Sequence, residues 1–482
     1  MLTGPRGPYG ASDVGPTAHF GPDHSIVRLN VSKQVRNGGL ERKTTVADAR
    51  QGGGPRPLAG LIMGAVDFQP PKHIAALGVP ESMTLDIVLR RALFDGHTST
   101  MQLANALAVT PFLMESAVEH MRHEHLLEVS GLEGRNLKLG LTELGRAQAI
   151  DRMGLCRYAG AIPVSLADYA EVVRGQHRQP KIHHDTIRKA FTDLVISDRL
   201  LDELGPAILA KGAIFLYGPP GTGKSSIAER LIRVHEDHVV VPRAVEVDGQ
   251  IITVFDPVIH QPTDPQPKNL DPRWVLCKRP SVIVGGELRG SQLDLSYDAN
   301  AGIYAAPLQM QANNGILVID DFGRQALTPE ELLNRWIVPL DRGIDYLTLD
   351  SGLKFELPCL TKIVFSTNME PGKLADEAFF RRIRSKVLIP SIDDDQFDQI
   401  LHAVANASGV TVVAGAAEHL REVSREKGDG DLRPYLPAVV CELVSSISDY
   451  EDMDRILDVA MVDRVAYLFF TQSDAMRETE TV

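Results

Sequence analysis

The sequence FLYGPPGTGKSS, Phe215 to Ser226, places three glycines and two prolines between an apolar run and a lysine. The residues that lead into it, AIFLYG, predict a buried strand, and those that follow, SIAERLIRV, predict a helix. Glycine permits unusual backbone dihedrals, so a loop of this composition between a strand and a helix allows a close approach of main chain to a ligand. We therefore begin with what such a loop can bind.

The residues GPPGTGKS match the pattern G-x-x-x-x-G-K-[ST] of a phosphate-binding loop. In such a loop backbone N–H groups turn inward around an anion, and the following helix start adds partial positive charge. Lys224 would reach the β- and γ-phosphates of ATP, and the Ser225 hydroxyl would ligate Mg²⁺. The predicted nucleotide-binding residues of the loop are Gly218, Pro219, Pro220, Gly221, Thr222, Gly223, Lys224, Ser225 and Ser226.

Two further apolar runs end in polar residues. NGILVIDDFG reads as an inner parallel strand followed by Asp320 and Asp321, and LTKIVFSTN as another strand ending at Asn368. Ligands bind at the carboxyl ends of such strands, so Asp320 would hold Mg²⁺, Asp321 would polarise the attacking water, and Asn368 would orient water or contact the γ-phosphate. Taken singly, these residues also fit turns that end strands.

The three segments, in this order, resemble an AAA+ ATPase over roughly residues 185–470. GPPGTGKS is similar to the Walker A motif of that family, ILVIDD to Walker B, and Asn368 matches the sensor 1 position. Most members place Glu after the Walker B Asp, whereas this chain has Asp321, which puts the rate of turnover in question more than nucleotide binding. The resemblance implies an αβα core, a small helical lid and a ring, often of six subunits.

The same resemblance suggests arginines that act on the nucleotide. DEAFFRRIRSKV is similar to the segment that carries the arginine finger, so Arg381 and Arg382 are the candidates to reach a neighbouring subunit's site. Arg433, in GDGDLRPYLP, is similar to sensor 2. A solvated basic helix end is the alternative for these arginines. In translocating members an aromatic residue between Walker A and Walker B enters the pore; Tyr297 and Tyr304 are candidates, although packing on the core explains each equally well.

Residues 84–153 carry three helical patterns, then a hairpin, then a helix. This order resembles a winged-helix domain. Many such domains bind DNA through the third helix, but here that helix, PFLMESAVEHMRHEHL, has Arg122 as its only fixed cation against Glu115, Glu119 and Glu124. DNA affinity depends on neutralising phosphates, so protein contact or regulation of the ring is favoured over DNA.

Composition sets the remaining limits. The chain has 482 residues and a net charge of −13, so it is not a general polyanion binder. Its four cysteines form no CxxC pair, which argues against a zinc site or a disulfide framework and favours the cytoplasm. No apolar run approaches the roughly 18 residues that span a bilayer.

The sequence predicts an α/β protein: a P-loop NTPase αβα core with a parallel sheet and a C-terminal helical lid, preceded by a small winged-helix (α+β) domain. The expected boundaries are a disordered arm at 1–60, the winged-helix-like domain at 61–160, the nucleotide-binding core at 161–390, and the lid and tail at 391–482. The expected function is Mg-ATP hydrolysis in a homo-oligomeric ring, a hexamer, that remodels an unidentified protein client. A DNA-linked ATPase and a nucleotide-gated scaffold with little turnover are the alternatives.

Overall fold

The computed structural model describes residues 68–133, 136–177, 182–373, 381, 383–427 and 430–470. The predicted disordered arm at 1–60 lies outside the described residues, and so does Arg382.

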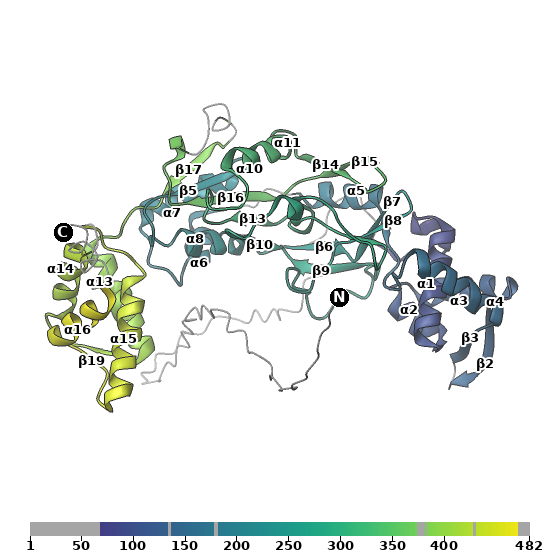
Figure 1. The fold of residues 1–482 in the computed structure, drawn as a ribbon, viewed down its shortest axis with the longest axis horizontal. Helices are drawn as coiled ribbons and strands as arrows, with labels where there is room; N and C mark the ends of the chain where they lie inside the picture. The colour runs from purple at the N-terminus through teal and green to yellow at the C-terminus, as the bar shows by residue number, and fades with distance from the viewer. Residues whose placement is uncertain are drawn as a thin grey trace, which may run out of the picture. The chain divides into compact units, whose positions relative to one another are not determined.

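Five parallel strands form the central sheet (Figure 1). They are, in chain order, β5 (Ile214–Tyr217), β10 (Ser281–Val284), β13 (Ile316–Ile319), β16 (Lys362–Thr367) and β17 (Ser385–Leu388). Their order across the sheet is β10-β13-β16-β5-β17, and each neighbouring pair is parallel. The carboxyl ends of all five strands therefore lie at one edge of the sheet.

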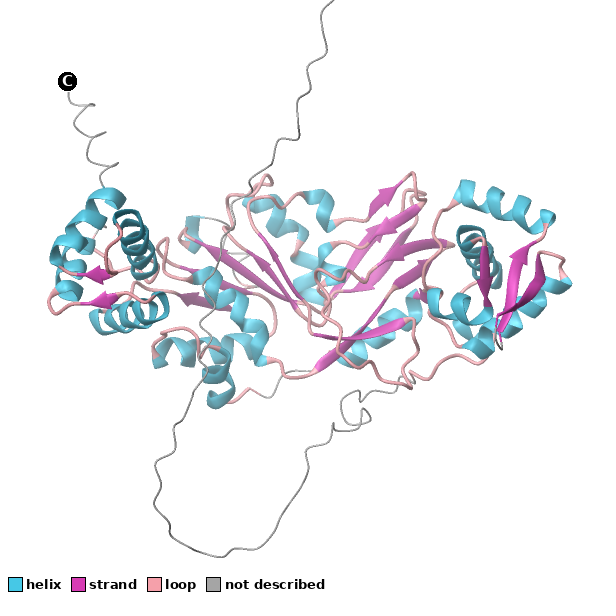
Figure 2. Ribbon diagram, turned by 90° about the horizontal axis from the view of Figure 1, so that it is seen from below, coloured by secondary structure: helices cyan, strands magenta, loops and turns pink. Residues whose placement is uncertain are grey.

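Helices cover both faces of this sheet (Figure 2). Successive side chains of a strand point to opposite faces, so neighbouring residues pack against different helices. Phe215 and Leu317 are buried with residues of helix α10, whereas Ile214 and Val318 are buried with residues of α6, α7 and α8. The helices are α6 (His184–Ala190), α7 (Asp198–Leu209), α8 (Lys224–Arg230) and α10 (Pro329–Arg335), followed by α11 (Ile337–Arg342). The predicted α/β fold, with a parallel sheet between two layers of helices, is confirmed.

The segment before β5 contains two helices rather than one. Helix α6 ends at Ala190, and α7 begins after Ser197, whose side chain accepts a hydrogen bond from the backbone N–H of Leu200. Ser197 is thus an N-cap that starts a new helix, so the pattern over HHDTIRKAFTDLVISDRLLDELG belongs to two helices with a turn between them.

Residues 74–155 form a small α+β unit. Its elements are η2 (Ile74–Leu77), α1 (Glu81–Asp95), β1 (His97–Ser99), α2 (Thr100–Ala106), α3 (Pro111–His123), β2 (Leu127–Glu133), β3 (Asn136–Leu141) and α4 (Glu143–Leu155). The three helices, the hairpin and the last helix agree with the sequence pattern. Strand β1, which pairs with β3, is too short to leave a pattern in the sequence. We call residues 74–155 the N-terminal module.

Further strands lie in the chain before β5, between β5 and β10, and between β10 and β13. Sheets are formed by β4 (Val164–Ser165), β6 (His238–Pro242), β7 (Ala244–Val247), β8 (Gln250–Thr253), β9 (Trp274–Lys278), β11 (Ser296–Asp298) and β12 (Ile303–Ala305). The segment HVVVPRAVEVDGQIITVFDP forms a hairpin only in its second half. There β7 and β8 turn at Asp248–Gly249, both at positive φ, whereas β6 pairs with β9. A second hairpin, formed by β14 (Ile344–Thr348) and β15 (Lys354–Pro358), precedes β16 in the chain.

The C-terminal helices bury a hydrophobic cluster of their own. They are α13 (Asp394–Ser408), α14 (Ala416–Lys427), α15 (Leu436–Glu451) and α16 (Val459–Phe470), with a short parallel pair of β18 (Thr411–Val412) and β19 (Ile456–Leu457). The remaining helical elements of the described residues are α5 (Leu166–Gln176) and α9 (Leu308–Gln311) and the turns η3 (Leu231–Val234), η4 (Gly290–Leu293) and η5 (Pro371–Lys373). In the described part of the chain no helix has the length and apolar character needed to cross a bilayer.

Candidate functional site

Three adjacent strands of the central sheet end in the residues that the sequence singles out. The phosphate loop follows β5, Asn368 follows β16, and Asp320 and Asp321 follow β13. Because β16 lies between the other two strands, Asn368 stands next to the acidic pair, and its Nδ2 donates to Asp321 Oδ1 at 3.3 Å. The fold thus brings residues that are far apart in the sequence to one edge of the sheet.

The phosphate loop has a backbone that its glycines make accessible. Gly218, Gly221 and Gly223 have φ values of 149°, 75° and 87°. A Cβ on Gly218 would lie 2.2 Å from the Ile389 carbonyl oxygen, so this position has no room for a side chain. Thr222 is buried, and its hydroxyl donates to the Pro219 carbonyl at 3.0 Å, which closes the loop on itself. These features fit a main-chain cradle for phosphate oxygens.

A Gly218→Ala substitution is therefore expected to destabilise the protein by about 1–3 kcal/mol, the usual cost of forcing atoms into a packed site. It should also weaken ATP binding, because the loop backbone must move to relieve the contact. Denaturant unfolding and calorimetric titration with ATP would measure both effects. Gly154→Ala is the control, since a Cβ there meets nothing within 4 Å. Equal stability and equal ATP affinity in the two variants would contradict the expectation.

Lys224 is the first residue of α8, and its ammonium group faces the loop. The side chain is buried, and Nζ donates to the carbonyl oxygens of Gly218 at 3.1 Å and Pro219 at 2.7 Å. Burial lowers the pKa of Lys224 to about 8, while the carboxylates of Asp320 and Asp321 act in the opposite direction. The amine is thus placed at the loop mouth at a pKa close to physiological pH. Beside it, the Ser225 side chain is exposed, and the Ser226 carbonyl accepts from Arg230 Nη1 at 2.8 Å.

The acidic pair lies in a turn, Asp320–Gly323, that we call the acidic turn. Asp321 is exposed and has a φ of 47°, in the left-handed region, and its backbone N–H donates to Asp320 Oδ1 at 3.0 Å. Phe322 fixes the turn to β16, since its N–H donates to the Ser366 carbonyl at 2.7 Å and its own carbonyl accepts from the Thr367 hydroxyl at 2.7 Å. Sequence reasoning did not single out Thr367, because a threonine inside a strand has no distinguishing pattern.

Arg433 contacts the phosphate loop from the C-terminal helices. Its Nη1 donates to the Pro220 carbonyl, and Nη2 lies 3.5 Å from Asp431 Oδ2. Its Nε is buried without a hydrogen-bond partner among the described residues. The Tyr435 ring, which sequence reasoning missed, packs so closely on Gly221 that a Cβ there would meet it at 2.6 Å. Arg433 therefore belongs spatially with the phosphate loop.

The remaining sequence candidates are Arg381, Arg382, Tyr297 and Tyr304. Arg381 is exposed, and Arg382 lies outside the described residues, so the finger role of both stays a prediction. Tyr297 and Tyr304 face each other across β11 and β12, with ring centroids 4.7 Å apart. Tyr304 is 3% exposed and its hydroxyl accepts from the Asp350 N–H, so core packing explains it, whereas Tyr297 is 40% exposed.

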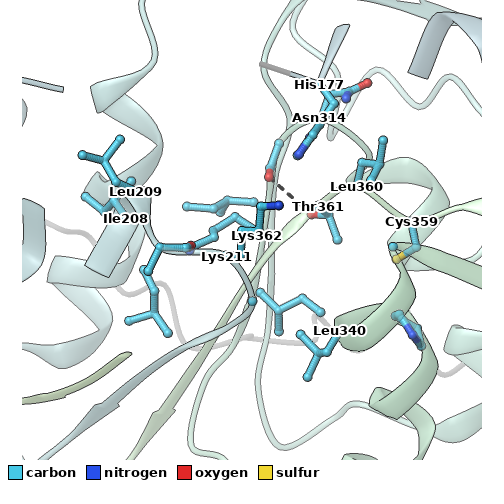
Figure 3. Close-up of a pocket in the computed structure, with 18 of the residues that line it drawn as sticks. His177, Ile208, Leu209, Lys211, Asn314, Leu340, Cys359, Leu360, Thr361 and Lys362 are labelled. Atoms are coloured by element: carbon cyan, nitrogen blue, oxygen red, sulfur yellow. Dashed lines mark hydrogen bonds between the residues drawn. The ribbon is translucent and has the colours of Figure 1, made fainter. Parts of the chain in front are cut away.

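A separate cavity of about 340 Å³ lies at the opposite edge of the sheet, where β5, β13 and β16 begin (Figure 3). Two of the cations that line it have protein partners: Lys362 Nζ donates to the carbonyls of Ala207 and Ala210 at the end of α7, and Arg279 pairs with Asp237 at 2.6 Å. The cavity shows no counterpart of the phosphate loop or of the acidic turn. We therefore place the functional site at the carboxyl edge.

A metal site built from protein side chains alone and thiol chemistry both have little support in the described residues. No group of three or more His, Cys, Asp or Glu side chains there could hold a metal ion. Burial raises the pKa of the Cys277 and Cys359 thiols to about 12 and that of Cys441 to about 11, so these thiols are poor nucleophiles. A Mg²⁺ ion at the carboxyl edge would fit instead the hard oxygens of Asp320 and Ser225 together with phosphate oxygens.

Comparisons with known proteins add little about activity. The family described as Domain of unknown function (DUF8689) matches residues 393–467, which span the C-terminal helices. No curated protein matches the sequence. A point mutant of Thermotoga maritima RuvB is 14% identical, with 60% of this chain and 70% of that chain covered and a TM-score of 0.32.

Two further solved structures are similar at the same level. NtrX from Brucella abortus is 11% identical, with 60% of this chain and 56% of that chain covered and a TM-score of 0.36. A Thermotoga maritima RuvB structure described as a Holliday junction branch migration motor is 14% identical, with 61% and 72% covered and a TM-score of 0.31. Likenesses this distant do not decide what the present chain acts on.

Proposed function

We propose that the protein is an ATPase of the AAA+ type, which binds and hydrolyses Mg-ATP in an oligomeric ring and uses the reaction to remodel a protein partner. The observation that carries this proposal is the meeting of Lys224, Asp321 and Asn368 at the carboxyl edge of the sheet, beside a loop whose backbone can receive phosphate. A loop with glycine dihedrals alone would support only anion binding. The acidic turn beside it adds groups that hydrolysis requires.

The geometry supports a role for each residue in this proposal. Main-chain N–H groups of the loop and the Lys224 ammonium would neutralise phosphate charge, and Asp320 with Ser225 would hold Mg²⁺. Asp321 accepts the proton of the attacking water, and Asn368 fixes the direction of its carboxylate through the 3.3 Å hydrogen bond. Bound Mg-ATP supplies the phosphoanhydride bond and the metal charge that offsets its oxygens.

Two arginine roles complete this assignment. Arg433 senses the occupied loop from the C-terminal helices, supported by its contact with Pro220. Arg381 and Arg382 act on the nucleotide of a neighbouring subunit, where an arginine stabilises the charge of the transferring phosphoryl group. This second role requires assembly, and a ring of six subunits would provide it.

We place the activity in the cytoplasm. All four cysteines, Cys156, Cys277, Cys359 and Cys441, are free. Free thiols are ordinary in a reducing compartment.

The N-terminal module is assigned to recruitment or regulation as a winged-helix domain. The solvent-exposed residues of α3 include Glu115 and Glu119, with Arg122 and His123 near its end, so this face lacks the excess of cations that phosphate contacts require. A hydrogen bond joins the module to the core: Arg273, which forms a buried ion pair with Asp271 at 2.8 Å, donates from Nη1 to the Leu77 carbonyl at 2.8 Å. Such a junction is suited to passing a partner's binding on to the core.

The test is to measure phosphate release and mass together. With ATP and Mg²⁺, the full-length protein should release phosphate and shift from lower-mass species to a ring in sedimentation or mass photometry. Chelation of Mg²⁺ should abolish the release, because the metal offsets the charge of the phosphate oxygens. A protein that stays monomeric with ATP, or that releases no phosphate, would contradict the proposal.

One observation supports a second candidate function. The carboxylate after Asp320 is the short side chain of Asp321, held by Asn368, so a scaffold that binds ATP and turns it over slowly is consistent with the same site. Tight ATP binding without turnover would favour the scaffold. Salt-dependent binding of DNA by the protein would favour a DNA-linked ATPase in its place.

A further inference from the structure

The acidic turn holds its second carboxylate in a backbone conformation that costs free energy. At a φ of 47° Asp321 is in the left-handed region, which residues with a Cβ adopt uncommonly. Such a conformation persists only when the surrounding structure fixes it. We therefore asked which contacts hold the acidic turn.

On one side the turn is attached to β16. Phe322 exchanges two hydrogen bonds with the end of that strand, through the Ser366 carbonyl and the Thr367 hydroxyl. Asn368 then reaches the Asp321 carboxylate itself. These contacts hold the middle of the turn, and the Arg324 N–H donates to the Asp321 carbonyl at 3.0 Å. The Asp320 carbonyl oxygen is left to be satisfied by another group.

On the other side the Gln325 side chain meets the turn. Its Nε2 donates to the carbonyl oxygens of Asp320 at 2.8 Å, Asp321 at 3.2 Å and Gly285 at 3.3 Å. Its Oε1 accepts from the Gly323 N–H at 2.9 Å. Because Gly285 directly follows β10, the amide of Gln325 ties the acidic turn to the strand on the far side from β16.

We propose that Gln325 is a positioning residue for hydrolysis, which fixes the left-handed conformation of Asp321 and so the direction of its carboxylate. This inference rests on the proposed function, in which Asp321 acts on water. Gln325 acts through the backbone of the turn and through no contact with nucleotide. The Gln325 amide both donates through Nε2 and accepts through Oε1. A side chain with only donors or only acceptors would therefore make only some of these hydrogen bonds.

Two substitutions of Gln325 distinguish the positioning role from a role in packing alone. Glu has the same shape as Gln, so Gln325→Glu preserves packing, but an ionised carboxylate gives no donor to the three carbonyl oxygens and is repelled by them. Met fills a similar volume without either function. A packing role therefore predicts that Gln325→Glu behaves like the wild type, whereas a positioning role predicts that it is no better than Gln325→Met.

The experiment measures kcat and KM for ATP in the full-length wild type, Gln325→Met and Gln325→Glu, with ATP affinity by calorimetry. We expect kcat to fall about 10²-fold, as for misplacement of a catalytic group by about 1 Å, while KM and the ATP dissociation constant stay within about threefold. Gln102→Met is the control. The Gln102 side chain also forms a hydrogen bond with the backbone, because its Oε1 accepts from the Ser99 N–H, but it lies in the N-terminal module. The kcat of this variant should equal that of the wild type.

Three outcomes would overturn the inference. Wild-type kcat in both Gln325 variants removes the role, and so does a rise in KM at constant kcat. If Gln325→Met fails to fold, Gln325→Glu decides alone, and near-normal turnover in it assigns Gln325 to packing. A wild-type protein without turnover would instead overturn the proposed function, and the positioning role with it.

Discussion

Replacing Lys224 by alanine is expected to remove most of the affinity of the protein for ATP and to lower kcat by about 10²–10³-fold, the usual loss for one preorganised donor at developing charge. The ammonium lies at the mouth of the phosphate loop, bonded only to two loop carbonyls, Gly218 and Pro219, in the described structure. Phosphate oxygens would be stronger acceptors than these neutral carbonyls. Calorimetric titration with ATP and a phosphate-release assay would measure the two losses.

The same residue gives the wild type a pH dependence with a defined sign. Burial lowers the pKa of Lys224 to about 8 in the free protein. A triphosphate binds the protonated amine, so ATP affinity should be constant below pH 8 and fall above it by up to about tenfold per pH unit. The Lys224→Ala variant lacks the group and should show no such fall. Undiminished ATP affinity in the variant, or an equal fall in both proteins, would contradict the assignment of Lys224.

The central sheet and its loops could be predicted from the sequence because each sequence pattern that indicates them is local. The apolar run before Gly218, the glycine spacing and the helical pattern after Lys224 follow one another directly in the sequence. Parallel strands with crossover helices then require that the residues after each strand share one edge. This is why Asp321 and Asn368 could be expected near the phosphate loop before the sheet order was known.

The contacts that hold the site in place were not open to prediction. Gln325, Thr367 and Tyr435 are polar or aromatic residues in ordinary surroundings, and their importance comes from partners that only the fold brings near. The sequence also could not show which tyrosine of β11 and β12 is buried. The burial of Tyr304 and the exposure of Tyr297 depend on which face of the strand pair meets the core.

Replacing Asp321 by asparagine should separate binding from hydrolysis. Asparagine keeps the size of the side chain and tolerates the left-handed backbone, so the acidic turn and the ATP affinity should change by no more than about threefold. It cannot accept a proton from water, so kcat should fall by about 10²–10⁴-fold, the contribution of a general base. Single-turnover phosphate release and calorimetry with ATP would measure both quantities. With ATP the variant should remain assembled and retain its protein partner.

The matched control is Asp248→Asn, at the turn between β7 and β8. Asp248 is also exposed and also has a positive φ, 50°, so this substitution makes the same chemical change in the same backbone conformation. Its kcat should equal that of the wild type. If Asp321→Asn hydrolyses ATP as fast as Asp248→Asn, the base lies elsewhere at the carboxyl edge. If Asp321→Asn loses ATP binding as well as turnover, the carboxylate serves the nucleotide or its metal, and the division of roles between Asp320 and Asp321 is wrong.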